Sequence, residues 1–502
     1  MSLKFKFIPL TFQKDEDEIK KQIRNTIILR HLFEQSNKTV PLKSLIESTQ
    51  YGYNASALLS GKNKFLRISD ITDGKVDWET VPFCDCDSED TYLLYTNDLL
   101  IARTGGTTGK SFLIIDPPAH SIYAGYLIRI RANNDADPLF LNLFLNSYVY
   151  WSQIVSLNEG EFRPSVNANT LKSLILPKCS LEKQRDAIKI SNNEYVKGYE
   201  SLIVDINNAI VNYDNCKSIN HECQKQKNII EPLKRTILEE AILGKLTSEW
   251  REKNKVKESA EDLYNLIKKD KEKKIKEKII KKEKELDPIA EDEIPHEIPE
   301  NWVWCRLGEL YSTTSGGTPL RANANYWFGD ITWYKSGELN DSYLDVESEE
   351  KISEIGLKES SATLFPKGTL LIAMYGATAG KLSILNRDAS TNQAICGFFY
   401  NEFIETKYLF YFLMAQRAKM ISDSWGMSQP NISQTYLRNF VFALPPREEQ
   451  KAIIEKVELL MNKCLKLSEE IEILDKHGKT LMKAIFNETF ETNKILENEI
   501  DK

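Results

Sequence analysis

Apolar residues recur at alternating intervals of four and three in two long segments of the chain, and this period predicts two long helices. The distal segment, in which Gly478 is the weak position, has Ile453, Val457, Leu460, Cys464, Leu467, Ile471, Leu474, Leu481 and Ile485. The central segment has Ile188, Tyr195, Tyr199, Leu202, Ile206, Ala209, Tyr213, Cys216, Cys223, Ile230 and Ile237. Such heptads are typical of coiled coils. We expect the two helices to pair antiparallel, with a break or kink at Pro232.

Three stretches recur in the same order along the chain, which predicts an internal duplication. They are FLRISDI from Phe65 with WYKSGEL from Trp333, LLIARTGGTTGK from Leu99 with LLIAMYGATAGK from Leu370, and RPSVNANTLKS from Arg163 with QPNISQTYLRN from Gln429. Their separations are nearly constant, at about 268, 271 and 266 positions. One order and one register indicate two copies of a domain of about 150 residues.

The expected fold class is therefore α+β, with two mixed α/β globular domains separated by a pair of long antiparallel coiled-coil helices. The expected segments are an N-terminal helix (1–38), a first globular domain (39–180), a central helical spacer (181–250), a charged helix with an acidic linker (251–297), a second globular domain (298–446), a distal helical spacer (447–490) and a tail (491–502).

Composition and charge narrow the classes of protein. No apolar run is long enough to span a membrane, and the N-terminus turns acidic without a signal-like region, so we expect a cytoplasmic protein. The eight cysteines and five histidines are dispersed, which predicts no metal site. A net charge of −7 argues against a general electrostatic grip on nucleic acid but permits a locally basic cleft.

The stretch RTGGTTGKS resembles a nucleotide phosphate-binding loop, GxxxxGK[ST], without completing it. Gly109, Lys110 and Ser111 fit the second half of the motif, but Thr104 stands where its first glycine is required. The second copy has Tyr375 at that position and Leu382 in place of the magnesium-binding hydroxyl. Since neither copy has the full set, these loops suit DNA better than a nucleoside triphosphate, although a triphosphatase stays an alternative.

Backbone donors, hydroxyls and cations around these loops are groups that satisfy phosphate oxygens, and the residues that differ between the copies are suited to reading bases. The DNA-binding candidates are Arg67, Arg103, Thr104, Lys110 and Arg163 in the first copy, and Thr318, Arg321, Lys335, Tyr375, Thr378, Lys381, Gln393 and Gln429 in the second. Tyr51, Tyr53 and Asn54 flank the first set. No catalytic residues are predicted.

Five motifs resemble, in order, a known family: IPENWVWCRLGEL, SGGTPLRANANYWFGDITWYKSGEL, FPKGTLLIAMYGATAGKLSIL, STNQAICGFF and LPPREEQKAIIEKVELL. They are similar to the target-recognition domain and following helix of Type I restriction-modification specificity subunits. The central ILEEAILGKLTSEWREKN resembles the end of the family's first helical spacer. The first copy departs from the family pattern, because it has SIYAG where the second has the Asn-Gln pair.

The resemblance implies a non-catalytic subunit. Its two recognition domains would each read one half of an interrupted double-stranded DNA sequence, and the helices would act as the spacer. Two modification subunits would bind S-adenosylmethionine and methylate adenine, and restriction subunits would carry an ATP-dependent translocase and nuclease. S-adenosylmethionine, ATP and magnesium are thus expected on the partners, none on this chain, and no membrane is involved.

Two further classes stay open: the specificity subunit of a related restriction system with a fused nuclease and methylase, and a non-enzymatic coiled-coil scaffold. The central helical region also exceeds the distal one by about 23 residues between equivalent points. We expect this extra length to contact either the N-terminal helix around Asp15 to Phe33 or a modification subunit.

Overall fold

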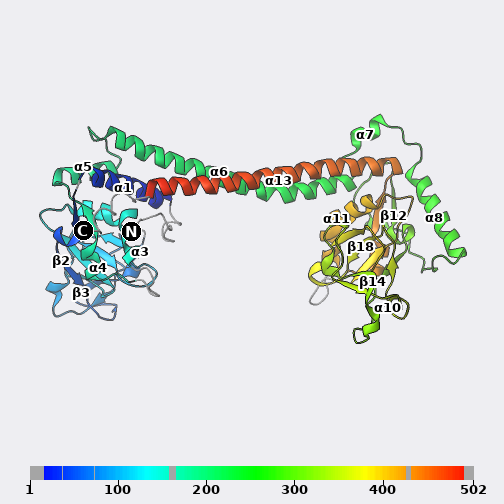
Figure 1. Cartoon of the computed structure of the whole chain (residues 1–502), viewed down its shortest axis with the longest axis horizontal. Coiled ribbons are helices and arrows are strands. Elements are labelled where there is room, and N and C mark those ends of the chain that lie inside the picture. Colours follow the sequence, from blue (N-terminus) through cyan, green and yellow to red (C-terminus); the bar gives the residue numbers. More distant parts are fainter. Residues whose placement is uncertain (1–15, 37, 73, 158–164, 425–430, 491–502) are drawn as a thin grey trace. The chain divides into compact units, whose positions relative to one another are not determined.

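The computed structural model describes residues 16–36, 38–72, 74–157, 165–424 and 431–490, and Figure 1 shows its elements along the chain. The chain divides into two compact units, a first unit of Met1–Cys223 with Ile473–Lys502 and a second unit of Gln224–Glu472. The long helices α6 (Glu200–Ile242) and α13 (Arg447–Phe490) contribute to both units. Within the described ranges, none of the helices has the length and apolarity needed to cross a membrane.

The first unit is built on an antiparallel sheet in the order β2-β10-β7-β8, a sheet in the order β6-β3-β9 and the pair β1-β11. Its strands are β1 (Thr39–Pro41), β2 (Ile46–Tyr51), β3 (Asn63–Leu66), β4 (Ile71–Thr72), β5 (Lys75–Val76), β6 (Phe83–Cys84), β7 (Leu99–Ala102), β8 (Ser111–Leu113), β9 (Ser121–Tyr123), β10 (Leu127–Ala132) and β11 (Ile175–Pro177). Its helices are α1 (Glu16–Gln35), α2 (Pro138–Leu145), α3 (Tyr148–Leu157), α4 (Ala168–Ser173) and α5 (Leu181–Ser191).

The second unit has sheets in the orders β13-β21-β18-β19-β15 and β16-β14-β20-β17, and the pair β12-β22. Its strands are β12 (Val303–Arg306), β13 (Thr313–Ser315), β14 (Trp327–Tyr334), β15 (Ser342–Leu344), β16 (Glu350–Ile352), β17 (Leu364–Phe365), β18 (Leu370–Ala373), β19 (Leu382–Leu385), β20 (Ala389–Thr391), β21 (Ile395–Phe398) and β22 (Val441–Leu444). Its shorter helices are α7 (Ser248–Lys253), α8 (Ala260–Lys276), α9 (Leu307–Leu310), α10 (Glu354–Lys358), α11 (Thr406–Asp423) and α12 (Gln434–Asn439).

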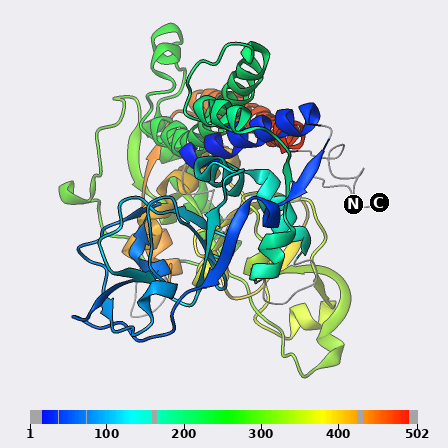
Figure 2. The same ribbon diagram turned by 90° about the vertical axis from the view of Figure 1, so that its left-hand side faces the viewer.

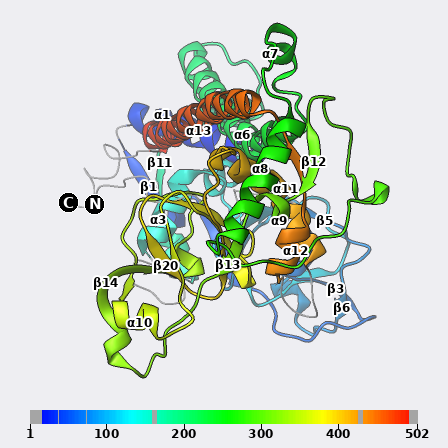
Figure 3. The same cartoon turned by 90° about the vertical axis from the view of Figure 1, so that its right-hand side faces the viewer.

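The charged segment between the two copies forms the helix α8, as predicted, and it is not a free tether. Leu263 and Ile267 on one face of α8 are buried in the core of the second unit. Lys271 donates hydrogen bonds to the carbonyls of Gly308 and Tyr311, at 2.6 and 3.2 Å. Figure 3 shows α8 against β12 and α9. Its apolar face thus attaches this helix to the second globular domain.

The predicted duplication is confirmed, because the second unit repeats the strand order of the first, with β15 and β17 added, and the same buried contacts. A buried glutamine in the first turn of α5 and of α13 shows this. Gln184 accepts a hydrogen bond from the backbone N–H of Asp137 at 2.8 Å, and Gln450 accepts one from Glu405 at 2.9 Å. In both copies the N–H precedes a helix of the globular domain, so one side chain joins the spacer to its domain in the same way.

The two long helices pair antiparallel within each unit. In the first unit, the ring of Tyr213 lies 6.0 Å from that of Phe486, and Asn220 lies against Gly478. In the second unit, the end of α6 and the start of α13 share one apolar core. The predicted α+β fold class with paired long helices is confirmed, whereas the seven segment boundaries stay predictions.

The central apolar period does not form one uninterrupted helix, contrary to the prediction. Helix α5 ends at Ser191 and α6 begins at Glu200. Asn193 and Gly198, between them, have positive φ of 65° and 92°, which right-handed helix excludes. The predicted seam residue Tyr195 is 70% exposed as a result. The heptads of the globular domain's last helix and of α6 therefore belong to separate helices.

Pro232 does not break the central helix, and the predicted kink stays a prediction. Helix α6 continues through Pro232 to Ile242. Ile230 and Ile237, on either side of the proline, are each 5% exposed. Burial of these side chains opposes the local cost of the missing N–H, which shows tertiary packing prevailing over propensity.

Three of the nine predicted distal seam residues are exposed. Leu467, Leu474 and Leu481 are 42%, 51% and 49% exposed, while Val457 and Ile471 are buried. Gly478, the weak position of the predicted seam, faces α6, because an added Cβ there would overlap the Asn220 side chain. The exposed leucines lie at the alternate heptad positions of α13.

The N-terminal helix α1 packs against the start of α6, which confirms one of the two expected partners for the extra central length. Lys20 forms an ion pair with Asp214 at 2.8 Å, and Lys217 pairs with Glu16. Arg30 donates to the carbonyl of Glu488 near the end of α13, at 2.7 Å. Figure 2 shows α1 (blue) beside the end of α13 (red). Helix α1 thus adds a third helix to the pair in the first unit.

Candidate nucleic-acid interface

The predicted residues of the second copy are carried by segments that meet at residues 391–395, here called the second hub. Its backbone bonds join three neighbouring segments: Gly316 N–H to Ile395 O (2.9 Å), Gly317 N–H to Thr391 O (2.9 Å), Asn392 N–H to Tyr334 O (3.0 Å) and Met374 N–H to Ala394 O (2.8 Å). These segments carry Thr318 and Arg321, Lys335, and Tyr375. Gln393 lies in the hub itself, so positions far apart in the sequence are brought together.

Residues 123–127, the first hub, make the corresponding bonds in the first copy. They are Gly52 N–H to Leu127 O (3.1 Å), Tyr53 N–H to Tyr123 O (2.8 Å), Ala124 N–H to Leu66 O (2.9 Å) and Arg103 N–H to Tyr126 O (2.9 Å). Every donor and acceptor has its counterpart in the other copy, at an offset of about 264 to 271 positions. This match aligns Asn54 with Thr318 and Gly125 with Gln393, which the sequence motifs left uncertain.

Glycines at the hubs allow backbones to approach closely. An added Cβ at Gly52 would overlap the carbonyl of Ala124, and one at Gly316 would overlap the backbone of Thr391. Gly317 faces the backbone of Ser361 in the same way. The Gly-Gly pair of the second copy is therefore required for packing, whereas only its first glycine has a counterpart in the other copy.

The glycine-rich loops are β-hairpins, so their geometry differs from that of a nucleotide phosphate loop, which leads from a strand into a helix. The first joins β7 to the antiparallel β8, and the second joins β18 to the antiparallel β19. Gly109 N–H donates to Ala102 O and Gly380 N–H to Ala373 O, both at 2.8 Å. These glycines have φ of 85° and 78°.

The lysines that close the hairpins use their backbone N–H groups internally, whereas phosphate binding by the other hairpin N–H groups stays a prediction. Lys110 N–H donates to Thr107 O at 2.9 Å, and Lys381 N–H donates to Thr378 O at 3.0 Å. The hairpins use these donors internally, so they are not available to a ligand. Thr104 is exposed, Tyr375 is 41% exposed, and Thr378 and both lysines are half-buried.

In each copy, a side chain from a helix donates a hydrogen bond to the carbonyl of the glycine near the end of the hairpin. Tyr150 on α3 donates to the carbonyl of Gly109 at 2.7 Å. On α11, Arg417 Nε donates to the carbonyl of Gly380 at 2.8 Å. The hairpins are thus held rigidly by different residues with one geometry.

Arg67 and Lys335, the predicted phosphate-binding cations at equivalent positions, both form ion pairs. Arg67 forms a fork with Asp70, at 2.7 and 3.1 Å. Lys335 Nζ lies 2.6 Å from Glu349 and 3.2 Å from Glu350. The hydrogen bonds to Glu349 and then Glu350 raise the pKa of Lys335. Both cations are therefore partly neutralised.

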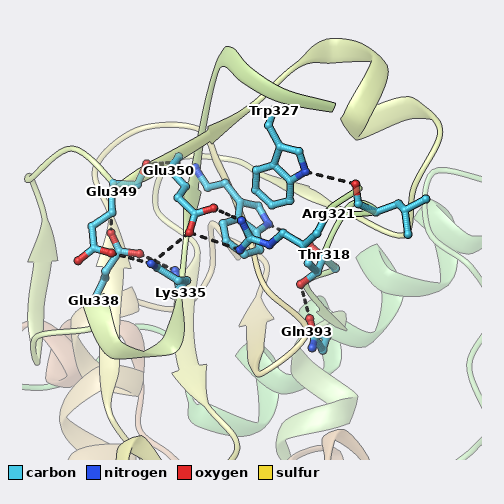
Figure 4. Close-up of polar contacts among 12 residues, drawn as sticks. Thr318, Arg321, Trp327, Lys335, Glu338, Glu349, Glu350 and Gln393 are labelled. Atoms are coloured by element: carbon cyan, nitrogen blue, oxygen red, sulfur yellow. Dashed lines mark hydrogen bonds and ion pairs between the residues drawn. The ribbon is translucent and has the colours of Figure 1, made fainter. Parts of the chain in front are cut away.

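Arg321, Thr318 and Gln393 lie together at one edge of the second copy (Figure 4). Thr318 Oγ1 donates to the side-chain oxygen of Gln393. The Arg321 guanidinium lies 3.9 Å from the ring centre of Trp327 and forms an ion pair with Glu350. Hydrogen bonds from Arg321 lower the pKa of Glu350. This arrangement brings three predicted residues into one polar cluster.

Arg103 lies over the ring of Tyr51, with its guanidinium carbon 4.9 Å from the ring centre. The Tyr51 hydroxyl accepts a hydrogen bond from the backbone N–H of Ala168 at 3.0 Å, which fixes the ring. Arg103 itself is exposed. The first copy thus presents a stacked cation beside its hairpin.

Arg163 and Gln429 lie outside the described residues. Trp327, Trp333 and Glu350 belong to the cluster around Arg321 but are missing from the sequence-based prediction. The even spacing of the two tryptophans in the WFGDITWY strand is a signal that could have placed them on one face. Glu350 gave no such signal, because its role depends on the pairing of β16 with β14.

Two copies of one α+β domain, each with differing side chains on a shared hub, define a duplicated binding protein with two related faces. Residues 299–474 match the sequence model of the family described as Type I restriction modification DNA specificity domain.

Individual relatives agree with this assignment. The chain is 30% identical over 262 residues to the Type I restriction enzyme EcoAI specificity subunit of Escherichia coli, which covers 47% of this chain and 41% of that one. It is 29% identical over 216 residues to the MjaIX specificity subunit of Methanocaldococcus jannaschii, covering 41% and 50%. The chain spans about half the length, or less, of these curated relatives.

Among solved structures, the HsdS subunit from Thermoanaerobacter tengcongensis is 16% identical, with a TM-score of 0.46 over 90% of this chain and 96% of that one. The predicted resemblance to Type I restriction-modification specificity subunits is confirmed by the family match and the named relatives.

Proposed function

We propose that this chain is the DNA-binding specificity subunit of a Type I restriction-modification complex. Each globular domain reads one half of a bipartite sequence and directs adenine methylation or restriction by partner subunits. The observation that carries the proposal is the pair of hubs: one backbone scheme is present twice, and one copy matches the sequence model of a DNA specificity family.

Differences between the copies support two distinct half-sites. Thr104 is aligned with Tyr375 on the hairpins, and Gly125 with Gln393 in the hubs. In the first copy the Asn54 side chain lies over Gly125, whereas in the second Thr318 bonds to Gln393. Side chains that change on a constant backbone are what two readers of different sequences need.

The exposed leucines on the flank of α13 support partner subunits. Leu467, Leu474 and Leu481 repeat every seven residues and remain outside the contact with α6. Such a row is covered when a further helix packs beside it. We infer that a helix of a modification subunit does so, and that restriction subunits join the same complex.

This function requires no catalysis by the chain itself. The internally bonded hairpins argue against nucleotide hydrolysis. S-adenosylmethionine, ATP and magnesium would be bound by the partner subunits. The complex would work in the cytoplasm, where the host DNA lies.

Mapping of methylated bases tests the proposal. Genomic DNA from a host that expresses this chain with its modification subunit would be sequenced by a single-molecule method that detects methyladenine. We expect one new interrupted motif, absent when this chain is omitted. An unchanged methylation pattern, or a motif without a gap, would overturn the proposal.

A further inference from the structure

The Arg321 side chain is held in a defined place by two indole rings. Its guanidinium carbon lies 3.9 Å from the ring centre of Trp327 and 5.1 Å from that of Trp333. The indoles are fixed in turn by the loop that carries Arg321, because Trp333 donates to Gly317 O at 2.9 Å and Trp327 to Leu320 O at 3.3 Å. The arginine is therefore ordered before any ligand arrives.

Glu350 completes this arrangement from the adjacent strand. Its carboxylate accepts hydrogen bonds from both terminal nitrogens of Arg321. The same carboxylate lies 3.2 Å from Lys335 Nζ. Figure 4 shows Glu350 between the two cations. One carboxylate thus occupies two side chains that were expected to bind DNA.

The first copy lacks the residue types of this cluster at the matching positions. Trp333 pairs with Glu350 across β14 and β16, and the corresponding contact in the first copy is Phe65 N–H to Pro82 O at 2.8 Å. Phenylalanine and proline therefore stand where the second copy has tryptophan and glutamate. Since the shared backbone forms without these groups, the cluster is an addition to the scaffold.

The remaining donors of Arg321 suit a base edge better than a phosphate. A guanidinium has five N–H donors, of which Glu350 accepts two. The Arg321 side chain is 54% exposed, so the others can face a ligand. A phosphate would have to approach the Glu350 carboxylate, whereas guanine presents the uncharged acceptors O6 and N7 to an arginine fork.

We propose that Glu350 is a specificity-determining residue of the second domain, which positions Arg321 to read a guanine and keeps Arg321 and Lys335 from binding the DNA backbone. This inference rests on the proposed function. The DNA affinity that this cluster contributes would then depend on the base sequence and not on the phosphate backbone.

Selection from a random duplex library tests the inference with the full-length chain. Wild type should enrich a bipartite sequence that contains a guanine in the second half-site. Glu350→Gln keeps the shape of the side chain but frees both cations. We expect it to lose the preference at that base, to bind unrelated duplex DNA about three- to tenfold more tightly, and to show a salt dependence steeper by about one phosphate contact.

Glu349→Gln is the matched control, because it removes the same charge from the neighbouring residue and contacts Lys335 but not Arg321. It should keep the base preference. Arg321→Lys keeps the charge without the fork and should lose the preference. An unchanged first half-site in every variant shows that the first domain is folded, and an unchanged denaturation curve shows the same of the second unit.

The outcomes distinguish a failure of the proposed function from a failure of the inference about Glu350. Failure of wild type to enrich any bipartite sequence would overturn the proposed function. Enrichment by wild type with an unchanged second half-site in Glu350→Gln would overturn the inference alone. An equal loss of preference in Glu349→Gln would show that charge, not the position of Arg321, sets the preference, and would also overturn it.

Discussion

The two hubs have the same backbone bonds, and each has one cation paired with carboxylates at an equivalent position, Arg67 in the first copy and Lys335 in the second. The further cation beside each hub, Arg103 or Arg321, has different partners. In the described part of the chain, Arg103 beside the first hub has no ion-pair partner and rests on Tyr51. Beside the second hub, Arg321 and Lys335 both contact Glu350. The duplication has therefore preserved the scaffold and changed the electrostatics. A phosphate can approach Arg103 directly, while a ligand of Arg321 must compete with a carboxylate.

The largest difference in the effect of a substitution on stability is predicted at the position where the helix after each globular domain joins that domain. The position before the shared glutamine is the fully buried Glu449 in the second copy and the exposed Lys183 in the first. Glu449 accepts hydrogen bonds from Thr247 (2.8 Å), Arg251 (2.5 Å), Asn301 (3.1 Å) and Trp302 (2.9 Å).

Glu449→Ala should lower the free energy of unfolding of the second unit by about 3–5 kcal/mol, because it leaves Arg251 without its anion in a buried site. Lys183→Ala should cost under about 1 kcal/mol, since an exposed lysine contributes little. Denaturation curves of both variants measure the contrast. Equal losses would show that the two junctions are equivalent despite their different contacts.

The hub glycines are predicted to behave alike in the two copies. Gly52→Ala and Gly316→Ala each place a Cβ against a hub carbonyl, so each should cost about 1–3 kcal/mol. Each variant should also lose recognition of its own half-site in library selection. Gly106→Ala and Gly337→Ala are matched controls, because an added Cβ there meets open space. A variant that impairs both half-sites would contradict the assignment of one hub to each.

Sequence periodicity was sufficient for the duplication and the long helices, because repeats and heptads are local signals. It could not show the break near Gly198, where backbone conformation decides, or the exposure of Leu474 and Leu481, which depends on the facing helix. Arg321 and Lys335 were found from the sequence as cations. Their neutralisation by Glu350 required the pairing of two strands that lie apart in the sequence, and such pairing has no local signature.

A smaller effect is predicted for single cations in DNA binding. Arg103→Ala should make the salt dependence of binding to unrelated duplex shallower by about 0.9 in logarithmic slope, the value for one lost phosphate contact. Lys335→Ala should change this slope less, because Glu349 and Glu350 already neutralise the lysine. Binding titrations across a range of salt concentrations compare them. A larger change for Lys335→Ala would reverse the proposed contrast between the domains.

The smallest predicted effect is a pH dependence of stability. It concerns one further segment in each unit: α1 in the first unit and the acidic linker in the second. Each includes a half-buried histidine: His31 stacks edge-on with Tyr199 at 5.8 Å, and His296 with Trp304 at 5.1 Å. Burial is the main cause that lowers the pKa of both below the ordinary 6.5.

Because the folded pKa values lie below the unfolded value, the unfolded chain takes up protons first as the pH falls through about 6.5, and stability then declines. The rings are partly solvated, so each histidine should change the free energy of unfolding by about a few tenths of a kcal/mol. Thermal denaturation at pH 7.5 and 5.5 should show a smaller pH effect in His31→Gln and in His296→Gln than in wild type. If one variant keeps the full pH effect, its histidine does not contribute to the pH dependence of stability. The two histidines would then not have equivalent roles.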